Sequence, residues 1–126
     1  MSSAKGNYLI ASYASNHMRS NPGSTKGHIV MFGDSAAGET PNRNYLPYLT
    51  AKASIDFMTR AFALELAGSG ILVNAIAPGP VMRHSGITEE SWIRDVLSKT
   101  PLGMESSSEE IAEIIVTLSR SQTING

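Results

Sequence analysis

The sequence predicts an α/β fold with a parallel, doubly wound sheet, of which only a part is present. Two short and nearly continuous apolar runs, residues 28–32 and 71–76, are typical of strands buried on both faces of a parallel sheet. Segments of helical periodicity precede, separate and follow these strands, and this alternation is the pattern of an α/β protein. Two strands make a very narrow sheet for so many helices. Residues 1–126 are therefore interpreted as a single partial domain of a larger doubly wound unit.

One long helix is expected before each strand. Apolar residues recur near helical spacing over residues 4–20, and Asn21-Pro22-Gly23 ends the run. Residues 46–67 carry a wide apolar stripe that ends at Gly68-Ser69-Gly70. The residues between the first strand and this second helix, 33–44, are expected to form a polar loop.

The last third of the chain is expected to hold two shorter helices. Ala77-Pro78-Gly79-Pro80 stops the second strand, because no regular element crosses such a sequence. Residues 88–99 follow as a helix that a threonine caps. Residues 107–120 form the last helix, in which Ser107 and Glu110 make a capping box and three isoleucines and a leucine form an apolar face.

Composition excludes several classes of function. Ten Lys and Arg against eleven Asp and Glu give a net charge of −1, which argues against binding to nucleic acid or to a membrane surface. Cysteine is absent and the three histidines are scattered, so no metal site is expected. No apolar run approaches the ~20 residues of a membrane span. With a hydrophobic content of 41% and no visible secretory signal, the sequence predicts a globular cytoplasmic protein.

Three residues form the candidate catalytic group: Ser35, Tyr48 and Lys52. Tyr48 and Lys52 are one helical turn apart and therefore share a face of the helix. An ammonium beside a phenol favours the phenolate, so Lys52 is expected to lower the pKa of Tyr48 from its usual value of about 10 and make it a general acid or base. Ser35 follows the carboxyl end of a strand, where open α/β sheets bind ligands. On spacing alone, the Tyr–Lys pair also fits a solvated lysine beside a surface tyrosine.

Around this group the sequence resembles the short-chain dehydrogenase/reductase family. Ser35 lies thirteen residues before Tyr48, in the order and spacing of that family. The similar segments cover almost the whole chain and comprise residues 27–30, 48–53, 61–67, 70–81, 100–103, 110–112 and 124–126. The resemblance implies the C-terminal half of a Rossmann-like domain of the classical type, similar to 3-oxoacyl-carrier-protein reductases and pteridine reductases. The first strands and the last strand of that fold would be missing.

The resemblance also implies a function and a role for each site residue. The function is an NAD(P)-dependent oxidoreductase that moves a hydride between nicotinamide and a carbonyl, an alcohol or a pterin-type substrate. Tyr48 would give or take the proton at the substrate oxygen, Lys52 would hold the nicotinamide ribose, and Ser35 would polarise the substrate carbonyl. The cofactor would be NADP or NAD, with NADPH slightly favoured. The residues implied at the cofactor are Tyr48, Lys52, Pro78, Gly79 and Val81.

The substrate side follows from the same resemblance. Residues 82–105 would form a lid region, with Trp92 as a candidate wall of the pocket and Pro80 beside the substrate. Relatives that reduce pterins use an Asp where others use Ser. Asp34 stands one residue early for that place, and a shift of the loop by one residue would exchange it with Ser35. Otherwise Asp34 caps the loop, which is a common role for Asp after a strand.

In this family the two long helices pack against a partner subunit. Leu9, Tyr13, Phe57 and Phe62 are therefore candidates for the surface of a homodimer or tetramer, although core packing explains them equally well.

One departure from the family leaves a second hypothesis open. The glycine-rich phosphate loop has no counterpart, since Gly33 and Gly38 follow the wrong strand at the wrong spacing. The 126 residues alone are therefore expected to be inactive, whereas within a longer chain they would form a working reductase. The alternative is a non-catalytic half-domain that folds only by pairing with a copy of itself or with a longer homologue. Exposed sheet edges and apolar helix faces would drive that association.

Overall fold

The chain forms a two-stranded parallel sheet flanked by helices. The computed structural model describes residues 2–35 and 43–126, so the predicted loop of residues 33–44 lies partly outside the described residues. In chain order the elements are α1 (Ser2–Met18), β1 (Gly27–Phe32), α2 (Leu46–Leu66), the 3₁₀ turn η1 (Ala67–Ser69), β2 (Ile71–Ile76), α3 (Glu89–Asp95), the 3₁₀ turn η2 (Leu97–Lys99) and α4 (Ser108–Arg120). The strands pair in register from Gly27 opposite Ile71 to Phe32 opposite Ile76.

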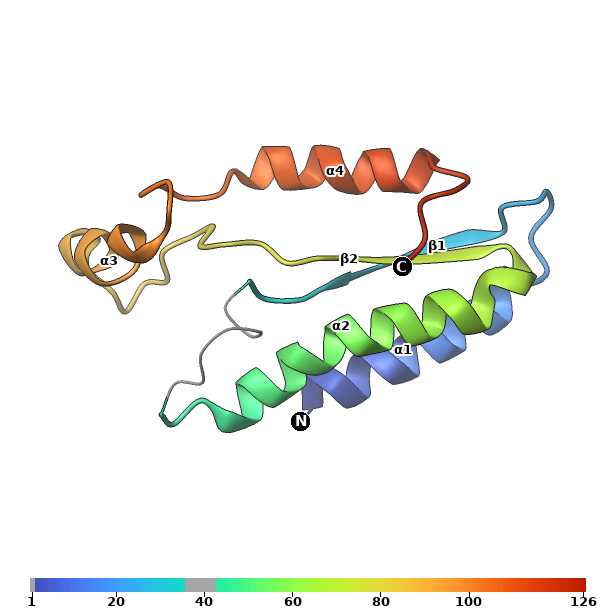
Figure 1. Ribbon diagram of the computed structural model, residues 1–126, viewed down its shortest axis with the longest axis horizontal. Helices are drawn as coiled ribbons and strands as arrows, with labels where there is room; N and C mark the ends of the chain where they lie inside the picture. Colours follow the sequence, from blue (N-terminus) through green and yellow to red (C-terminus); the bar gives the residue numbers. More distant parts are fainter. Residues whose placement is uncertain (1, 36–42) are drawn as a thin grey trace.

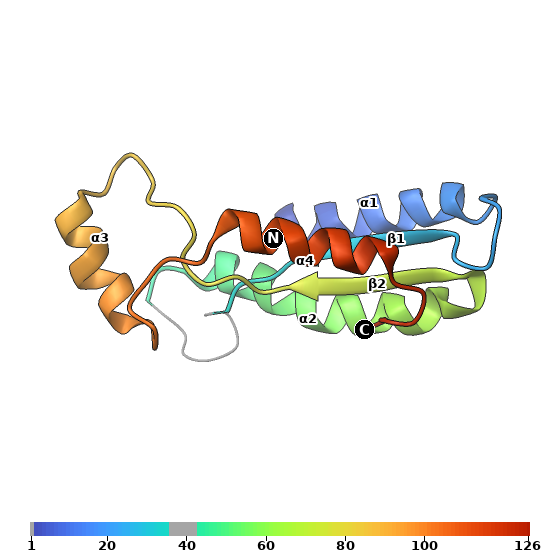
Figure 2. The same ribbon diagram turned by 90° about the horizontal axis from the view of Figure 1, so that it is seen from above.

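Helices cover both faces of the sheet, as the doubly wound prediction requires. In Figure 1, α1 and α2 lie side by side beneath the sheet and α4 lies above it. Figure 2 shows the same layers from above, with α4 crossing in front of the strands. The short helix α3 stands beyond the carboxyl ends of the strands, away from the sheet (Figure 1).

The core fills the space between the sheet and the α1–α2 layer. Ile55 of α2 and Ile71 and Val73 of β2 are its largest fully buried side chains. The buried cluster consists of Ala11, Met31, Ile55, Ala63, Leu66, Ile71 and Val73. Burial of this apolar area, at roughly 25 cal/mol per Å², is the main force that holds the two helices against the strands.

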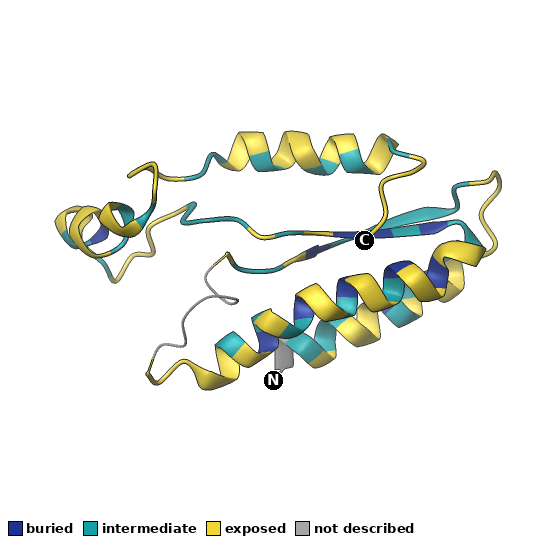
Figure 3. Cartoon of the chain, in the orientation of Figure 1, coloured by how far each residue is buried: buried dark blue, intermediate teal, exposed yellow. Residues whose placement is uncertain are grey.

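The opposite face of the sheet is less covered than the sequence predicts. Both strands are expected to be buried on two faces, but among the residues of β1 Met31 alone is buried. The reason is α4, whose residues are all described and of which none is buried. Its predicted apolar face rests on the sheet only in part, and Ile114 within it is 49% exposed. Figure 3 shows α4 without buried residues, while buried positions follow α2 and the strands.

The boundary between α2 and β2 confirms the predicted glycine stop. Gly70 adopts a φ of 71°, in the left-handed region that side-chain-bearing residues rarely occupy. A Cβ at this position would lie 2.3 Å from the backbone oxygen of Ser24. The tight turn therefore needs glycine for its conformation and for the close approach of the preceding loop.

The two predicted helices at the ends of the chain differ little from those observed. The first is predicted over residues 4–20 and ends at Met18, where the Asn21 N–H donates to the Met18 carbonyl at 2.9 Å and Ser20 Oγ donates to the His17 carbonyl at 3.0 Å. The last helix is confirmed, and its cap is the Ser107 hydroxyl, which accepts from the Glu110 N–H at 3.2 Å.

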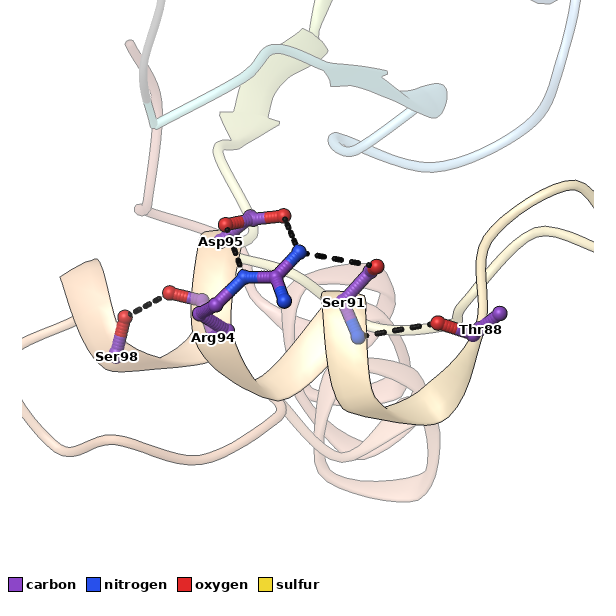
Figure 4. A network of polar contacts seen from close by, with 5 residues as sticks. All are labelled: Thr88, Ser91, Arg94, Asp95 and Ser98. Carbon is purple, nitrogen blue, oxygen red and sulfur yellow. Dashed lines mark hydrogen bonds and ion pairs between the residues drawn. The ribbon is translucent and has the colours of Figure 1, made fainter.

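The predicted helix over residues 88–99 is wrong in its second half. Thr88 caps the start, since its hydroxyl accepts from the Ser91 N–H at 3.2 Å, but the α-helix ends at Asp95 and a 3₁₀ turn follows. Ser98 Oγ donates to the Arg94 carbonyl within this segment. Such side-chain bonds compete with the helical ladder of the backbone. Figure 4 shows these contacts, in which the Arg94 guanidinium also donates hydrogen bonds to Asp95 and Ser91.

The last residues of the chain are bound to the sheet. The Gly126 N–H donates to the Val73 carbonyl at 2.8 Å, and the Val73 N–H donates to Asn125 Oδ1 at 2.9 Å. Asn74, buried in β2, donates from its amide to the Ile124 carbonyl at 2.9 Å. The buried Asn74 therefore has a structural partner. Residues 124–126 cover the edge of β2 that does not pair with β1.

Candidate active site

The candidate site lies where β1 and β2 end. The Gly33 N–H donates to the Ile76 carbonyl at 2.8 Å, and the Ser35 N–H donates to the Pro78 carbonyl at 3.4 Å. The segments that follow β1 and β2 therefore remain paired beyond the strands, because parallel strands that start in register leave the sheet at the same edge. This pairing brings the residues after β1 and those after β2 to one place, as the sequence predicts for the carboxyl edge.

Tyr48 and Lys52 reach this edge from the first half of α2. They stand one turn apart, and Tyr48 is 47% exposed. Lys52 Nζ donates to the Phe32 carbonyl at 3.1 Å, which joins α2 to the end of β1. An ammonium has three donors, and this bond uses one of them. Lys52 therefore retains donors that can bind the hydroxyl groups of a ligand.

The charged group that contacts the Tyr48 hydroxyl is a carboxylate. Tyr48 Oη donates a hydrogen bond to Asp34 Oδ2. This bond, together with partial burial and the negative charge of Asp34, raises the pKa of Tyr48 to about 12. The structure therefore differs from the expectation that Lys52 lowers this pKa, because the hydroxyl faces Asp34 while the Lys52 ammonium is bonded to a backbone carbonyl.

An open pocket of about 360 Å³ lies beside this group. Its walls come from the end of β1, the middle of α2 and the end of β2. The described lining residues are Gly33, Asp34, Ser35, Lys52, Ala53, Ile55, Asp56, Ala75 and Ala77. Three of the predicted site residues, Asp34, Ser35 and Lys52, thus line this pocket, and Tyr48 joins them through its bond to Asp34.

Among the pocket residues that sequence reasoning missed, one is charged. Asp56 lines the pocket, one helical turn after Lys52, and its carboxylate pairs with Arg60 at 3.0 Å. The spacing from Lys52 could have indicated it, since residues four apart in a helix share a face. The contact between Asp34 and Tyr48 was also missed, and no local pattern indicates it, because the two residues are fourteen positions apart and separated by a loop.

The segment predicted to face the nicotinamide runs along the same edge. Pro78, Gly79, Pro80 and Val81 are half-buried. The Pro80 carbonyl accepts from the Ser106 N–H at 2.7 Å, and a Cβ on Gly79 would lie 3.2 Å from the Ser106 hydroxyl. This segment is therefore bonded on one side to Ser35, which lines the pocket, and on the other side to Ser106, which precedes α4. It is not among the described lining of the pocket.

Trp92 belongs to α3. It is buried, 8% exposed, and its indole N–H donates to Glu105 Oε1 at 2.6 Å. Because α3 stands beyond the strand ends, this contact ties α3 to the turn before α4 within the region 82–105 (Figure 1). Trp92 is not among the described residues that line this pocket, and its role as a wall of the substrate pocket stays a prediction.

Within residues 2–35 and 43–126, neither a metal site nor a membrane span is found. No group of three or more His, Asp or Glu side chains is arranged to hold a metal ion. No helix in that part of the chain is both long and apolar enough to cross a bilayer.

Comparison with known proteins defines the class. The family described as Enoyl-(Acyl carrier protein) reductase matches residues 1–126. The chain is 31% identical to NADPH-dependent aldehyde reductase 2 of Arabidopsis thaliana over 114 residues, which are 88% of this chain and 40% of that protein. It is 35% identical to Glucose 1-dehydrogenase 2 of Bacillus subtilis over 109 residues, covering 85% of this chain and 41% of that protein.

The fold agrees with solved structures. A short-chain dehydrogenase of Leptospira borgpetersenii with bound NAD⁺ superposes with a TM-score of 0.79, at 24% identity, over 96% of this chain and 48% of that one. The chain spans about two fifths of the length of the curated relatives named above. The fold is therefore an incomplete Rossmann-type α/β fold. The chain belongs to the short-chain dehydrogenase/reductase family.

Proposed function

We propose that this chain forms the proton-transfer part of an NAD(P)-dependent oxidoreductase, which moves a hydride between nicotinamide and a carbonyl or alcohol. The observation that carries the proposal is the cluster at the carboxyl edge of the sheet. Asp34, Ser35 and Lys52 line one pocket, and Tyr48 is bonded to Asp34 beside them. A phenol, a hydroxyl and an ammonium around one open pocket are suited to proton transfer at a substrate oxygen.

Each of these residues has a distinct role in the proposal. In reduction, the Tyr48 O–H gives its proton to the substrate oxygen. The Ser35 hydroxyl donates a hydrogen bond to the same oxygen and stabilises its developing negative charge. The Lys52 ammonium binds ribose hydroxyl groups with the donors that its bond to Phe32 leaves available. Its positive charge also offsets the negative charge of Asp34 near Tyr48.

The residues present fit the nicotinamide end of a dinucleotide. The pocket of about 360 Å³ is open, and Lys52 on its wall supplies charged donors suited to ribose hydroxyls. Pro78, Gly79 and Val81 would contact the nicotinamide through their backbone, and when bound this group supplies or accepts the hydride. NADPH is proposed ahead of NADH because one relative is an NADPH-dependent aldehyde reductase, although the Leptospira structure carries NAD⁺.

The substrate is proposed as a small carbonyl or pterin-type compound. Asp34 on the pocket wall is an acceptor for N–H groups of a ligand, which supports the pterin-type alternative. Pro80 and Trp92 stay predictions as substrate contacts, and so does a lid role for residues 82–105. The cytoplasmic location also stays a prediction.

The test compares Tyr48→Phe with Tyr45→Phe. Tyr45 precedes α2, is exposed, and therefore serves as a matched control. NADPH and NADH binding and the rate of cofactor oxidation with aldehyde, ketone and pterin substrates are measured for the purified protein, in the full-length chain where these residues are part of one. We expect Tyr48→Phe to lose at least a hundredfold in kcat while cofactor affinity changes by less than about threefold, since general acid–base catalysis contributes typically 10²–10⁴-fold. Equal rates for both variants would rule out the role of Tyr48.

If neither cofactor binds, the proposal gives way to the non-catalytic half-domain. Association would then be the remaining function.

We also propose that the outer surface of α1 and α2 contacts a second copy of the chain. Core packing does not account for Leu9, Tyr13 and Phe57, which are 51%, 71% and 70% exposed. Phe62 is half-buried and packs against the ring of Tyr8 at 5.7 Å. Exposed large apolar side chains on two adjacent helices are typical of association surfaces. Sedimentation of the wild type and of Phe57→Glu tests the proposal: the variant is expected to be monomeric, and an unchanged mass would contradict it.

A further inference from the structure

The segment of residues 81–105, which contains the predicted lid region, leaves the molecule and returns to the same point. The Ser106 N–H donates to the Pro80 carbonyl at 2.7 Å, so the two residues that bracket the segment are bonded to each other. Between them the chain passes through α3 and η2. Figures 1 and 2 both show α3 beyond the carboxyl ends of the strands, apart from the other helices. The Pro80–Ser106 bond therefore forms the base of the segment.

The polar contacts of this segment are internal. Within residues 2–35 and 43–126, every hydrogen bond and ion pair made by residues 81–105 joins two members of the segment. The Arg83 guanidinium, for example, donates to the Ile87 carbonyl at 2.8 Å. Among the described helices and strands, η2 is the element against which α3 chiefly packs. No polar contact in that part of the chain, apart from the base, fixes where the segment stands relative to the sheet.

One internal bond crosses the segment from α3 to the base. The Trp92 indole N–H donates to Glu105 Oε1 at 2.6 Å, and Glu105 directly precedes Ser106. All residues from 81 to 105 are described, and Trp92 is the one among them that is buried. An indole has a single N–H to donate, and a carboxylate accepts more strongly than a neutral carbonyl. This bond therefore holds α3 to the base and ties the middle of the segment to its end.

The base is connected to the candidate site through the residues that follow β2. The Ser35 N–H, on the pocket wall, donates to the Pro78 carbonyl at 3.4 Å. Two residues later, the Pro80 carbonyl accepts the bond from Ser106, and a Cβ on Gly79 would lie 3.2 Å from the Ser106 hydroxyl. The position of residues 81–105 is thus set within a few residues of the pocket.

We propose that Glu105 is a positioning residue that holds α3 and the rest of residues 81–105 as one body beside the carboxyl edge, and thereby sets the affinity for the substrate. The inference rests on the proposed function, in which the substrate binds at that edge. It goes beyond that function because it assigns a role to a residue that takes no part in the proton transfer.

The expected effect falls on substrate binding. A ligand that needs the segment in one position binds only the fraction of molecules that hold it there, so its apparent dissociation constant is the intrinsic value divided by that fraction. Without the Glu105 carboxylate, the Trp92 N–H has no partner in its buried position, and the segment leaves that position more often. Tyr48 and Ser35 are unchanged once the substrate is bound. The loss therefore raises KM and leaves kcat in place.

The first measurement is the steady-state kinetics of carbonyl reduction, in the full-length chain where these residues are part of one. We expect Glu105→Ala to raise the substrate KM by about fivefold or more, while kcat and the Kd of the cofactor change by less than about twofold. Glu105→Gln is expected to behave as the wild type, because its amide oxygen accepts the same bond. Glu113→Ala, which removes an exposed carboxylate from α4, is the matched control.

The second measurement is hydrogen exchange by NMR and needs no ligand. The amide N–H groups of Trp92, Val96 and Gly103 are bonded to carbonyls within the segment. In Glu105→Ala we expect all three to exchange about tenfold faster or more, and by a common factor, because one body opens as a unit. The amides of β1 and β2 should keep their rates. Trp92→Phe, which keeps a ring without an N–H, should match Glu105→Ala, and the double variant should add nothing.

Several results would overturn the inference. They are unchanged exchange in Glu105→Ala, a loss confined to kcat, and equal KM values for Glu105→Ala and Glu113→Ala. If Glu105→Ala does not fold, Glu105→Gln and Trp92→Phe decide. Wild-type KM in the Gln variant and a raised KM in the Phe variant support the role of Glu105, and a wild-type KM in both contradicts it.

The two proposals fail in different ways. A protein that binds neither NADPH nor NADH would overturn the proposed function, while hydrogen exchange would still show whether Glu105 holds residues 81–105 in place. A working reductase whose KM does not respond to Glu105→Ala would overturn the inference about Glu105 and leave the function in place.

Discussion

The ammonium of Lys52 donates a hydrogen bond to the backbone carbonyl of Phe32 at 3.1 Å, and this bond joins α2 to the last residue of β1. Phe32 is followed by Gly33, Asp34 and Ser35, which line the candidate pocket. The same lysine therefore lies on the pocket wall and supports the loop that carries Asp34 and Ser35.

Replacing Lys52 should affect catalysis more than folding. Lys52→Met keeps the length of the side chain and removes its donors and its charge. We expect at least a tenfold loss in kcat/KM for NADPH-dependent reduction. The free energy of unfolding should fall by no more than about 1 kcal/mol, because a typical hydrogen bond contributes about 0.5–1.5 kcal/mol. Urea denaturation and steady-state kinetics measure the two effects. Lys99→Met in η2 is the matched control, and equal kinetics for the two variants would contradict this role.

Two substitutions in α2 should separate its buried and exposed faces. Ile55 is 1% exposed within the core, whereas Leu64 is 83% exposed on the same helix. We expect Ile55→Ala to lower the free energy of unfolding by about 2–5 kcal/mol, because it leaves a cavity. Leu64→Ala should change it by less than about 0.5 kcal/mol, because it removes no buried contact. Chemical denaturation measures the free energy of unfolding of both variants. A similar loss of this free energy in both would mean that the outer side of the α1–α2 layer faces something other than solvent.

The turn between α2 and β2 should tolerate a side chain at one glycine and reject it at the next. Gly70→Ala is expected to destabilise the protein by more than about 1 kcal/mol, because φ is 71° and the new Cβ would meet the Ser24 oxygen at 2.3 Å. An added Cβ on Gly68 meets none of the described atoms within 4 Å. Gly68→Ala should therefore be neutral or slightly stabilising. The thermal midpoints of both variants provide the measurement, and equal midpoints would show that the turn can move away from Ser24.

Trp92 provides a spectroscopic test of the region 82–105, because it is the single tryptophan of the chain. Its indole N–H donates to Glu105 Oε1 at 2.6 Å. We expect Glu105→Ala to shift the fluorescence emission to the red and to increase quenching by acrylamide, since the buried indole loses its partner and meets water. Glu113→Ala, in α4, should leave the emission unchanged. An unshifted spectrum for Glu105→Ala would show that packing, and not this bond, holds Trp92.

Most element boundaries could be read from the sequence because their signals are local. The apolar runs 28–32 and 71–76 coincide with β1 and β2 to within a residue. Glycine after α2 and the Thr88 and Ser107 caps act within one turn of the chain, so their effect hardly depends on the rest of the fold. The split of the helix over 88–99 was missed, because Ser98 was not expected to turn back onto the Arg94 carbonyl.

Candidate site residues could be named from the sequence, but their contacts could not. Ser35, Tyr48 and Lys52 follow from spacing and from resemblance to a family, and the structure places them at one edge of the sheet. The partners of Tyr48 and Lys52 could not be predicted, because a hydrogen bond across fourteen or twenty residues depends on the path of a loop and the rotation of α2 against β1.

The sequence by itself determined the order of helices and strands, the position of the caps and the family, since each depends on periodicity and on residues close together in the chain. The tertiary structure decided which charge contacts Tyr48, how far α4 covers β1, and that the Trp92 indole bonds Glu105. Those outcomes depend on distances between elements, which the packing of apolar faces sets and which no single segment encodes.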